Sequence, residues 1–112
     1  MRASALVDVF SRNSLVTTDA VLLEVGNTLS RNFKRESVQI IETLVAASEV
    51  EIVRLTPELW AQSFGLYRSY LDKEWGLVDC ISFTVMQQRN IASALTFDQH
   101  FVQAGFTALM RE

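Results

Sequence analysis

The feature that most constrains the fold is the alternation of strand-like and helix-like segments along a chain of 112 residues. The strand-like segments have β-forming or alternating apolar residues and cover residues 15–17, 50–55, 91–96 and 106–110. Strands that alternate with helices usually pair in parallel, because each helix returns the chain to the same end of the sheet. The sequence therefore predicts a single α/β domain over residues 1–112, built around a mainly parallel sheet.

Capping residues and apolar spacing mark the helices. The strongest start is Thr56-Pro57-Glu58, which combines a capping hydroxyl, a proline at the first helical position and an acid near the positive helix end. We expect this helix to reach about residue 71, with Trp60, Phe64 and Tyr67 in the core. The other helices are expected at residues 3–10, 18–32, 37–45, 79–89 and 98–104. We expect Ser37 to cap the third of these and Gly105 to end the last, because a left-handed backbone costs glycine little.

Composition excludes several classes of protein. Apolar residues make up 49% of the chain and charged residues 21%, which is typical of a globular domain. The net charge of −3 gives no global basic field, so contact with nucleic acid would depend on a local patch. The lone cysteine cannot form an internal disulfide. No apolar run approaches the ~20 residues that span a bilayer and the start has no signal-peptide pattern, so we expect a cytoplasmic protein without membrane contact.

Three acidic residues lie in apolar surroundings at the edges of predicted elements. Asp79 opens a helix, Asp98 follows the segment 91–96, and Glu24 is the only charge in the apolar first half of a helix. Ligands usually bind where parallel strands end, so we expect the three carboxylates to converge there. Converging carboxylates repel one another unless they hold protons or bind a cation. Oxygen ligands without a histidine or thiol cluster favour Mg²⁺ or Mn²⁺ over zinc, and such ions activate water for phosphodiester hydrolysis.

Each of these residues also has a structural interpretation. Asp79 and Asp98 can act as helix N-caps, and Glu24 can lie on a solvated helix edge. His100, the only histidine, is either a general base or a surface residue on a short helical turn. Cys80 is either a reactive thiol or a small buried residue. Spacing alone leaves these alternatives open.

Taken together, the motifs resemble those of PIN domains, and most closely the VapC-like toxins of type II toxin–antitoxin pairs. The matching segments are Thr17-Thr18-Asp19 leading into Glu24, Leu77-Val78-Asp79-Cys80-Ile81-Ser82-Phe83, the run from Ala94 to Phe101, and Ala104-Gly105-Phe106. This resemblance implies a three-layer α/β/α fold and a Mg²⁺- or Mn²⁺-dependent endoribonuclease whose site is a group of four acids. By motif, Glu24, Asp79 and Asp98 match three of these acids.

The resemblance also implies roles for other residues and for partners. Thr96 matches a hydroxyl position close to the metal, and we place Thr18 near the metal or the substrate as well. Arg31, Lys34 and Arg35 form the only basic cluster, which is interpreted either as an RNA contact or as a solvated helix terminus. The implied partners are an RNA substrate, a small VapB-like antitoxin and a second copy of the chain in a homodimer.

One family feature has no match in the sequence. PIN domains open with a strand that carries the first metal-binding aspartate and lies between the second and fourth strands. Asp8 falls only 16 residues before Glu24, too close for that strand and the helices that follow it. We therefore expect an N-terminally truncated domain. Two functions remain: a metal-dependent ribonuclease, or a catalytically inactive PIN-like module that binds an antitoxin or itself.

Overall fold

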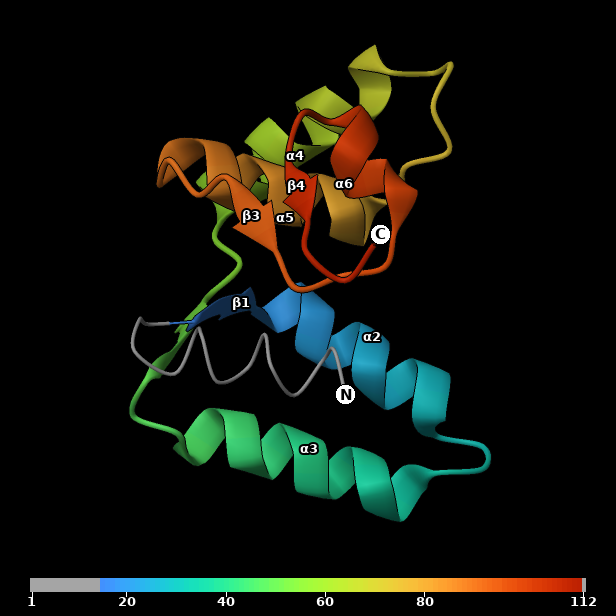
Figure 1. Ribbon diagram of the computed structural model, residues 1–112, viewed down its shortest axis with the longest axis vertical. Coiled ribbons are helices and arrows are strands. Elements are labelled where there is room, and N and C mark those ends of the chain that lie inside the picture. Colours follow the sequence, from blue (N-terminus) through green and yellow to red (C-terminus); the bar gives the residue numbers. More distant parts are fainter. Residues whose placement is uncertain (1–14, 112) are drawn as a thin grey trace.

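Helices and short strands alternate in the computed structural model, which describes residues 15–111 (Figure 1). The strands are β1 (Leu15–Thr18), β2 (Val50–Val53), β3 (Ser93–Ala94) and β4 (Thr107–Ala108). The helices are α2 (Asp19–Leu29), α3 (Lys34–Ala46), α4 (Pro57–Ser69), α5 (Leu77–Gln88) and α6 (Gln99–Gln103). The prediction of an α/β fold is confirmed. The helix predicted at residues 3–10 lies outside the described residues, as does Asp8.

The strands form two parallel pairs instead of one continuous sheet. Strand β1 pairs with β2, with Leu15 opposite Val50, and β3 pairs with β4, with Ser93 opposite Thr107. In Figure 1, α2 and α3 lie below β1, and α4, α5 and α6 lie above it, so helices cover both sides of the strands. The parallel pairing is as predicted, although β3 and β4 are shorter than the segments expected to form them.

A groove of ≈ 540 Å³ separates the two strand pairs. Its walls include β1 and residues 93–96, and side chains of α5 contribute to its lining. Within residues 15–111 no strand lies between β1 and β3, so the strand edges that face the groove form no ladder with each other. The groove therefore lies beside the strands on which the sequence placed a site.

Helix α5 forms the centre of the core. Its buried residues include Ile81 and Val85, which pack with Ala20 of α2 and Leu59 of α4. On the other side of α5, Phe83 is fully buried and belongs to a second, aromatic cluster. Because neighbouring elements pack on both sides of α5, its first turn is held in a fixed position.

The aromatic cluster fastens α6 to α5. The Phe83 ring packs edge-on against Trp75 and Phe101, with ring centroids 5.1 Å and 4.9 Å away. The Trp75 indole N–H also donates a hydrogen bond to the side-chain oxygen of Gln103 in α6 (3.0 Å). Edge-to-face aromatic pairs contribute stabilisation beyond their buried area, so this cluster determines where α6 lies.

The prediction that the aromatic side chains of α4 lie in the core is wrong. Trp60, Phe64 and Tyr67 are 44%, 37% and 40% exposed and stack on one another along the helix surface. The contact with α5 is made instead by Leu59 and by Ser63, which is fully buried and donates a hydrogen bond to the Thr84 hydroxyl (3.2 Å). A serine at this contact lets the two helices approach closely, which turns the larger aromatic rings outward.

Helix termini follow the sequence signals in two cases and differ in a third. The Thr56 hydroxyl caps α4 by accepting a hydrogen bond from the Leu59 N–H (3.1 Å), as expected. Gly105 follows α6 with a φ of +97°, a conformation that glycine adopts without strain. Ser37, expected to cap a helix, is instead buried inside α3. None of the described helices has both the length and the apolar character needed to cross a membrane.

Replacing Phe83 with alanine tests the aromatic cluster. We expect the free energy of unfolding to fall by about 3–5 kcal/mol, because loss of a buried ring leaves a cavity that the core fills only in part. Urea unfolding followed by circular dichroism measures the change. The matched control is Phe97→Ala, at a side chain 65% exposed, with an expected effect within about 0.5 kcal/mol. Equal losses in the two variants would contradict the central position of Phe83.

Candidate active site

Asp79 lies in the first turn of α5. The helix begins two residues earlier than predicted, at Leu77, and its N-cap is Gly76, which has no capping side chain. The Asp79 Oδ2 atom accepts a hydrogen bond from the Gly76 N–H (3.1 Å), which satisfies a backbone group at the helix start. The predicted capping role is thus present in a modified form, and it uses only one of the two carboxylate oxygens.

Asp98 is the N-cap of α6. Its Oδ1 atom accepts a hydrogen bond from the His100 N–H (2.8 Å). Its own N–H donates to the Thr96 hydroxyl (3.0 Å), so the chain before α6 is held by a short local network. The Asp98 side chain is 42% exposed, compared with 20% for Asp79.

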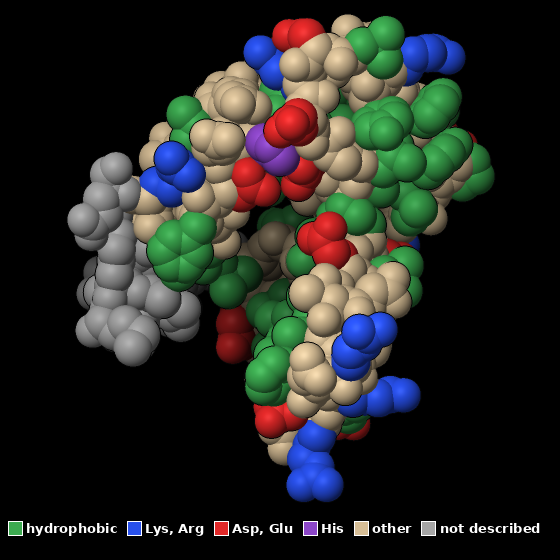
Figure 2. Space-filling model, turned by 90° about the vertical axis from the view of Figure 1, so that its right-hand side faces the viewer, with side chains coloured by type: hydrophobic (Ala, Val, Ile, Leu, Met, Phe, Trp, Pro, Cys, Tyr) green, Lys and Arg blue, Asp and Glu red, His purple; other side chains and the backbone are tan. Residues whose placement is uncertain are grey.

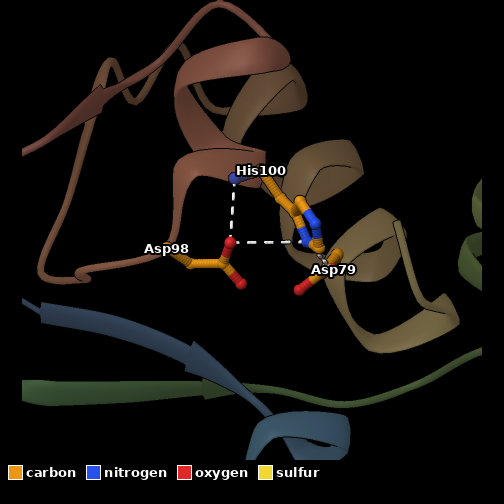
Figure 3. A group of neighbouring side chains, drawn as sticks. All are labelled: Asp79, Asp98 and His100. Atoms are coloured by element: carbon orange, nitrogen blue, oxygen red, sulfur yellow. Dashed lines mark hydrogen bonds and ion pairs between the residues drawn. The ribbon is translucent and has the colours of Figure 1, made fainter. Parts of the chain in front are cut away.

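His100 brings these two aspartates together. Its Nδ1 atom lies 3.1 Å from Oδ2 of Asp79 and 3.4 Å from Oδ1 of Asp98. Figure 3 shows the imidazole between the two carboxylates, one from the first turn of α5 and the other from the start of α6. One donor atom from each of the three side chains lies within 4.8 Å of the others. The imidazole is 21% exposed and takes part in this acid–histidine cluster, so the interpretation as a surface residue is incomplete.

Among the described residues, neither Asp79 nor Asp98 forms an ion pair with a lysine or an arginine. Nearby carboxylates disfavour each other's charged form unless a proton or a cation compensates. Two carboxylates and an imidazole nitrogen within contact distance are a donor set that fits a divalent cation.

Glu24 contributes a third carboxylate to the same groove. It lies on α2 and is exposed, and its side chain lines the groove together with Asp79 and Asp98. Figure 2 shows the hollow with acidic side chains around its rim and the single histidine above it. The three predicted acids therefore meet at one groove, but only Asp79 and Asp98 belong to the close cluster. Their role as metal ligands stays a prediction.

Comparison with known proteins assigns the fold. A model of the PIN domain matches residues 2–107 of the chain. The chain belongs to the PIN domain family.

Two matched relatives carry the name 23S rRNA-specific endonuclease VapC20 and come from two strains of Mycobacterium tuberculosis. Each is 26% identical over 98 residues, which cover 88% of this chain and 75% of the relative. The crystal structure of M. tuberculosis VapC20, described as a Sarcin-Ricin loop cleaving toxin, superposes with a TM-score of 0.77 at 26% identity. That match covers 84% of this chain and 72% of the other, and it confirms the PIN-like fold. The similarity is to VapC-like ribonuclease toxins.

The two threonines assigned to this PIN-domain site both line the groove. The Thr18 hydroxyl is the N-cap of α2 and accepts a hydrogen bond from the Val21 N–H (3.2 Å), and the residue is only 3% exposed. The Thr96 hydroxyl accepts from the Asp98 N–H. Each hydroxyl thus has a structural task at the edge of the site, and proximity to a metal stays a prediction for both.

Cys80 is not a reactive nucleophile in this PIN domain. Its side chain is fully buried, and burial raises the pKa of the thiol above its usual value, with a smaller contribution from the negative charge of Asp79. Since the thiolate is the nucleophilic form, a thiol held protonated is inert. The alternative of a small buried residue is the one that the structure supports.

The predicted basic cluster lies at the connection between α2 and α3. Arg31 is in the turn after α2, and Lys34 and Arg35 begin α3; all three are exposed. The first turn of a helix is its positive end, so the helix dipole does not favour cations at Lys34 and Arg35. In Figure 2, basic side chains lie on the lower part of the face that contains the hollow.

Substitution of Thr18 separates a capping role from a role at the metal. We expect Thr18→Ala to lower the free energy of unfolding by about 0.5–2 kcal/mol, because α2 loses its N-cap. Thr18→Ser keeps the hydroxyl and is expected to retain most of that stability. Urea unfolding and Mn²⁺ titration of both variants provide the measurement. A loss of Mn²⁺ affinity without a loss of stability would assign Thr18 to the metal site instead.

Proposed function

We propose that this PIN-domain protein is a divalent-metal-dependent endoribonuclease of the VapC-like kind, which hydrolyses RNA phosphodiester bonds at the groove. The proposed catalytic and metal-binding residues are Glu24, Asp79 and Asp98. The observation that supports this most is the convergence of Asp79 and Asp98, from separate helices, without a lysine or arginine partner among the described residues. The similarity to an endonuclease with an rRNA substrate supports RNA as the substrate class.

Mg²⁺ or Mn²⁺ is the proposed cofactor. Both cations favour oxygen ligands, and Asp79 and Asp98 each keep one carboxylate oxygen that accepts no hydrogen bond from residues 15–111. Glu24 offers a further carboxylate from α2. When bound, the cation supplies a water of lowered pKa for attack on phosphorus.

The chain's own residues orient the carboxylates. Asp79 is fixed by its hydrogen bond from Gly76, and Asp98 by its hydrogen bond from the His100 backbone. Thr96 holds the backbone of Asp98 at the groove. These contacts fix the acidic side chains in advance, so that less conformational freedom is lost when a cation binds.

Partners are proposed from the resemblance and from exposed apolar surface. A VapB-like antitoxin and a second copy of the chain are the proposed protein partners. The stacked side chains of Trp60, Phe64 and Tyr67 on α4 support a surface that another protein covers, because exposed apolar groups of this size often mark interfaces.

Cleavage of structured RNA in Mn²⁺ tests the nuclease. We expect Asp79→Asn and Asp98→Asn each to lower the cleavage rate by at least ~100-fold, because each removes a charged ligand of the cation. EDTA should have the same effect. The control is Asp72→Asn, the same chemical change at a side chain 71% exposed and paired with Lys73, which should cleave normally. Circular dichroism establishes that each variant is folded.

The outcomes separate the two candidate functions. Cleavage that persists in both site variants and in EDTA would reject the proposed mechanism. A folded chain that does not cleave RNA in Mg²⁺ or Mn²⁺, yet binds a VapB-like antitoxin, would favour the inactive binding module instead.

Charge reversal at the start of α3 tests the proposed RNA contact. We expect Lys34→Glu combined with Arg35→Glu to weaken RNA binding and to reduce the slope of log affinity against log salt by about 1.4, at ~0.7 per phosphate contact. Arg68→Glu combined with Lys73→Glu makes the same charge change at the end of α4 and the loop that follows it. If both double variants lose affinity equally, only net charge matters, and the contact at α3 is wrong.

A further inference from the structure

We propose that His100 is itself a ligand, through Nδ1, of the divalent cation held by Asp79 and Asp98, and that it gives the site a preference for Mn²⁺ over Mg²⁺. The proposal rests on the metal site of the proposed function but adds a nitrogen ligand that an all-carboxylate site lacks. It concerns metal binding and can be tested without RNA.

The distances in the cluster are those of ligands that share one ion. Neighbouring ligands of an octahedral ion lie ~3.0 Å apart, and opposite ones ~4.2 Å, when each is about 2.1 Å from the metal. The Nδ1 atom lies 3.1 Å from Oδ2 of Asp79 and 3.4 Å from Oδ1 of Asp98. These are the oxygens that also accept the capping hydrogen bonds, and a carboxylate oxygen has a second lone pair with which it can bind an ion. The full set of donors spans no more than 4.8 Å. A small contraction therefore suffices to place all three around one cation.

The imidazole is held in this position by the fold. Its backbone N–H is bound by Asp98, and the next residue, Phe101, packs edge-on against the buried ring of Phe83. Asp79 approaches from the first turn of α5. Since elements on both sides of the cluster are fixed by core packing, the nitrogen and the two carboxylates are pre-organised.

The tautomer of the neutral ring decides between two roles. If Nδ1 carries the proton, it donates to Asp79 and orients that carboxylate beside the ion. If the proton is on Nε2, the lone pair of Nδ1 is free to bind the metal. No described residue accepts a hydrogen bond from Nε2, so water can satisfy a proton there. A cation between two carboxylates favours the second arrangement, because it replaces the hydrogen bond with a metal bond.

The nitrogen ligand has a consequence for metal choice. Mg²⁺ favours oxygen ligands and gives up its water reluctantly, whereas imidazole is a common ligand of first-row transition ions. An imidazole at the site therefore strengthens Mn²⁺ binding more than Mg²⁺ binding. An imidazole that only orients Asp79 would strengthen both equally.

Pulsed electron paramagnetic resonance on the Mn²⁺-loaded, unsubstituted protein tests the ligand directly. A nitrogen bound to Mn²⁺ modulates the electron spin echo, and we expect this ¹⁴N modulation in the unsubstituted protein and in Asp72→Asn. It should disappear in His100→Ala. Bound Mn²⁺ without the modulation in the unsubstituted protein would overturn the proposal, and this result does not depend on whether the His100 variant folds.

Affinities measured by calorimetry give a second readout. We expect His100→Ala to weaken Mn²⁺ binding by about 10-fold or more and Mg²⁺ binding by less than about 3-fold. Equal weakening would mark His100 as a positioning residue and reject ligation. The ¹⁴N modulation in a protein that does not cleave RNA would support ligation by His100 and reject the proposed nuclease. Metal-dependent RNA cleavage without the ¹⁴N modulation would support the nuclease and overturn ligation by His100. The absence of Mn²⁺ binding would overturn both proposals.

Discussion

Helix α5 is buried along most of its length, and its packing determines where the acidic side chains lie. Six of its twelve residues are buried, and its surroundings include α2, α4 and the aromatic cluster. The contact between Phe83 and Phe101 places α6 beside the first turn of α5. Asp98 and His100 therefore reach Asp79 because of an apolar contact. Favourable burial of the rings offsets the repulsion that two neighbouring carboxylates introduce.

Elements that depend on local chemistry were predictable from the sequence. The Thr56 cap, the turn at Gly105 and the order of helices and strands follow from the conformational preferences of a few adjacent residues. The outward face of α4 was not predictable in the same way. Trp60 and its aromatic neighbours have the spacing of a core-facing stripe, but the small side chain of Ser63 determines which face approaches α5. Which face of α4 is buried depends on its tertiary contact with α5, and the spacing of apolar residues along the chain carries no information about that contact.

The site also combines features that follow from adjacent residues with features that depend on tertiary contacts. The sequence placed Asp79 and Asp98 at a candidate site because acids in apolar segments at helix starts are costly without a partner. A capping role does not exclude a site, since each carboxylate caps with one oxygen and leaves the other without a hydrogen bond from residues 15–111. Metal binding by these residues stays a prediction. His100 was missed as a member of the cluster because its ring position depends on how α6 packs against α5. The one available signal was its place two residues after Asp98, which the sequence also explains as an ordinary helical turn.

The groove explains why a cation would matter to the fold as well as to catalysis. Glu24 reaches it from α2, whereas Asp79 and Asp98 reach it from α5 and the start of α6. The strand pair β1–β2 lies beside α2 and β3–β4 beside α6, whereas α5 packs against both α2 and β1. No ladder joins the two strand pairs in the described chain. A cation shared by the three acids would join the two sides of the groove. Because the unfolded chain has no such site, binding stabilises the folded state in proportion to the logarithm of cation concentration above the dissociation constant.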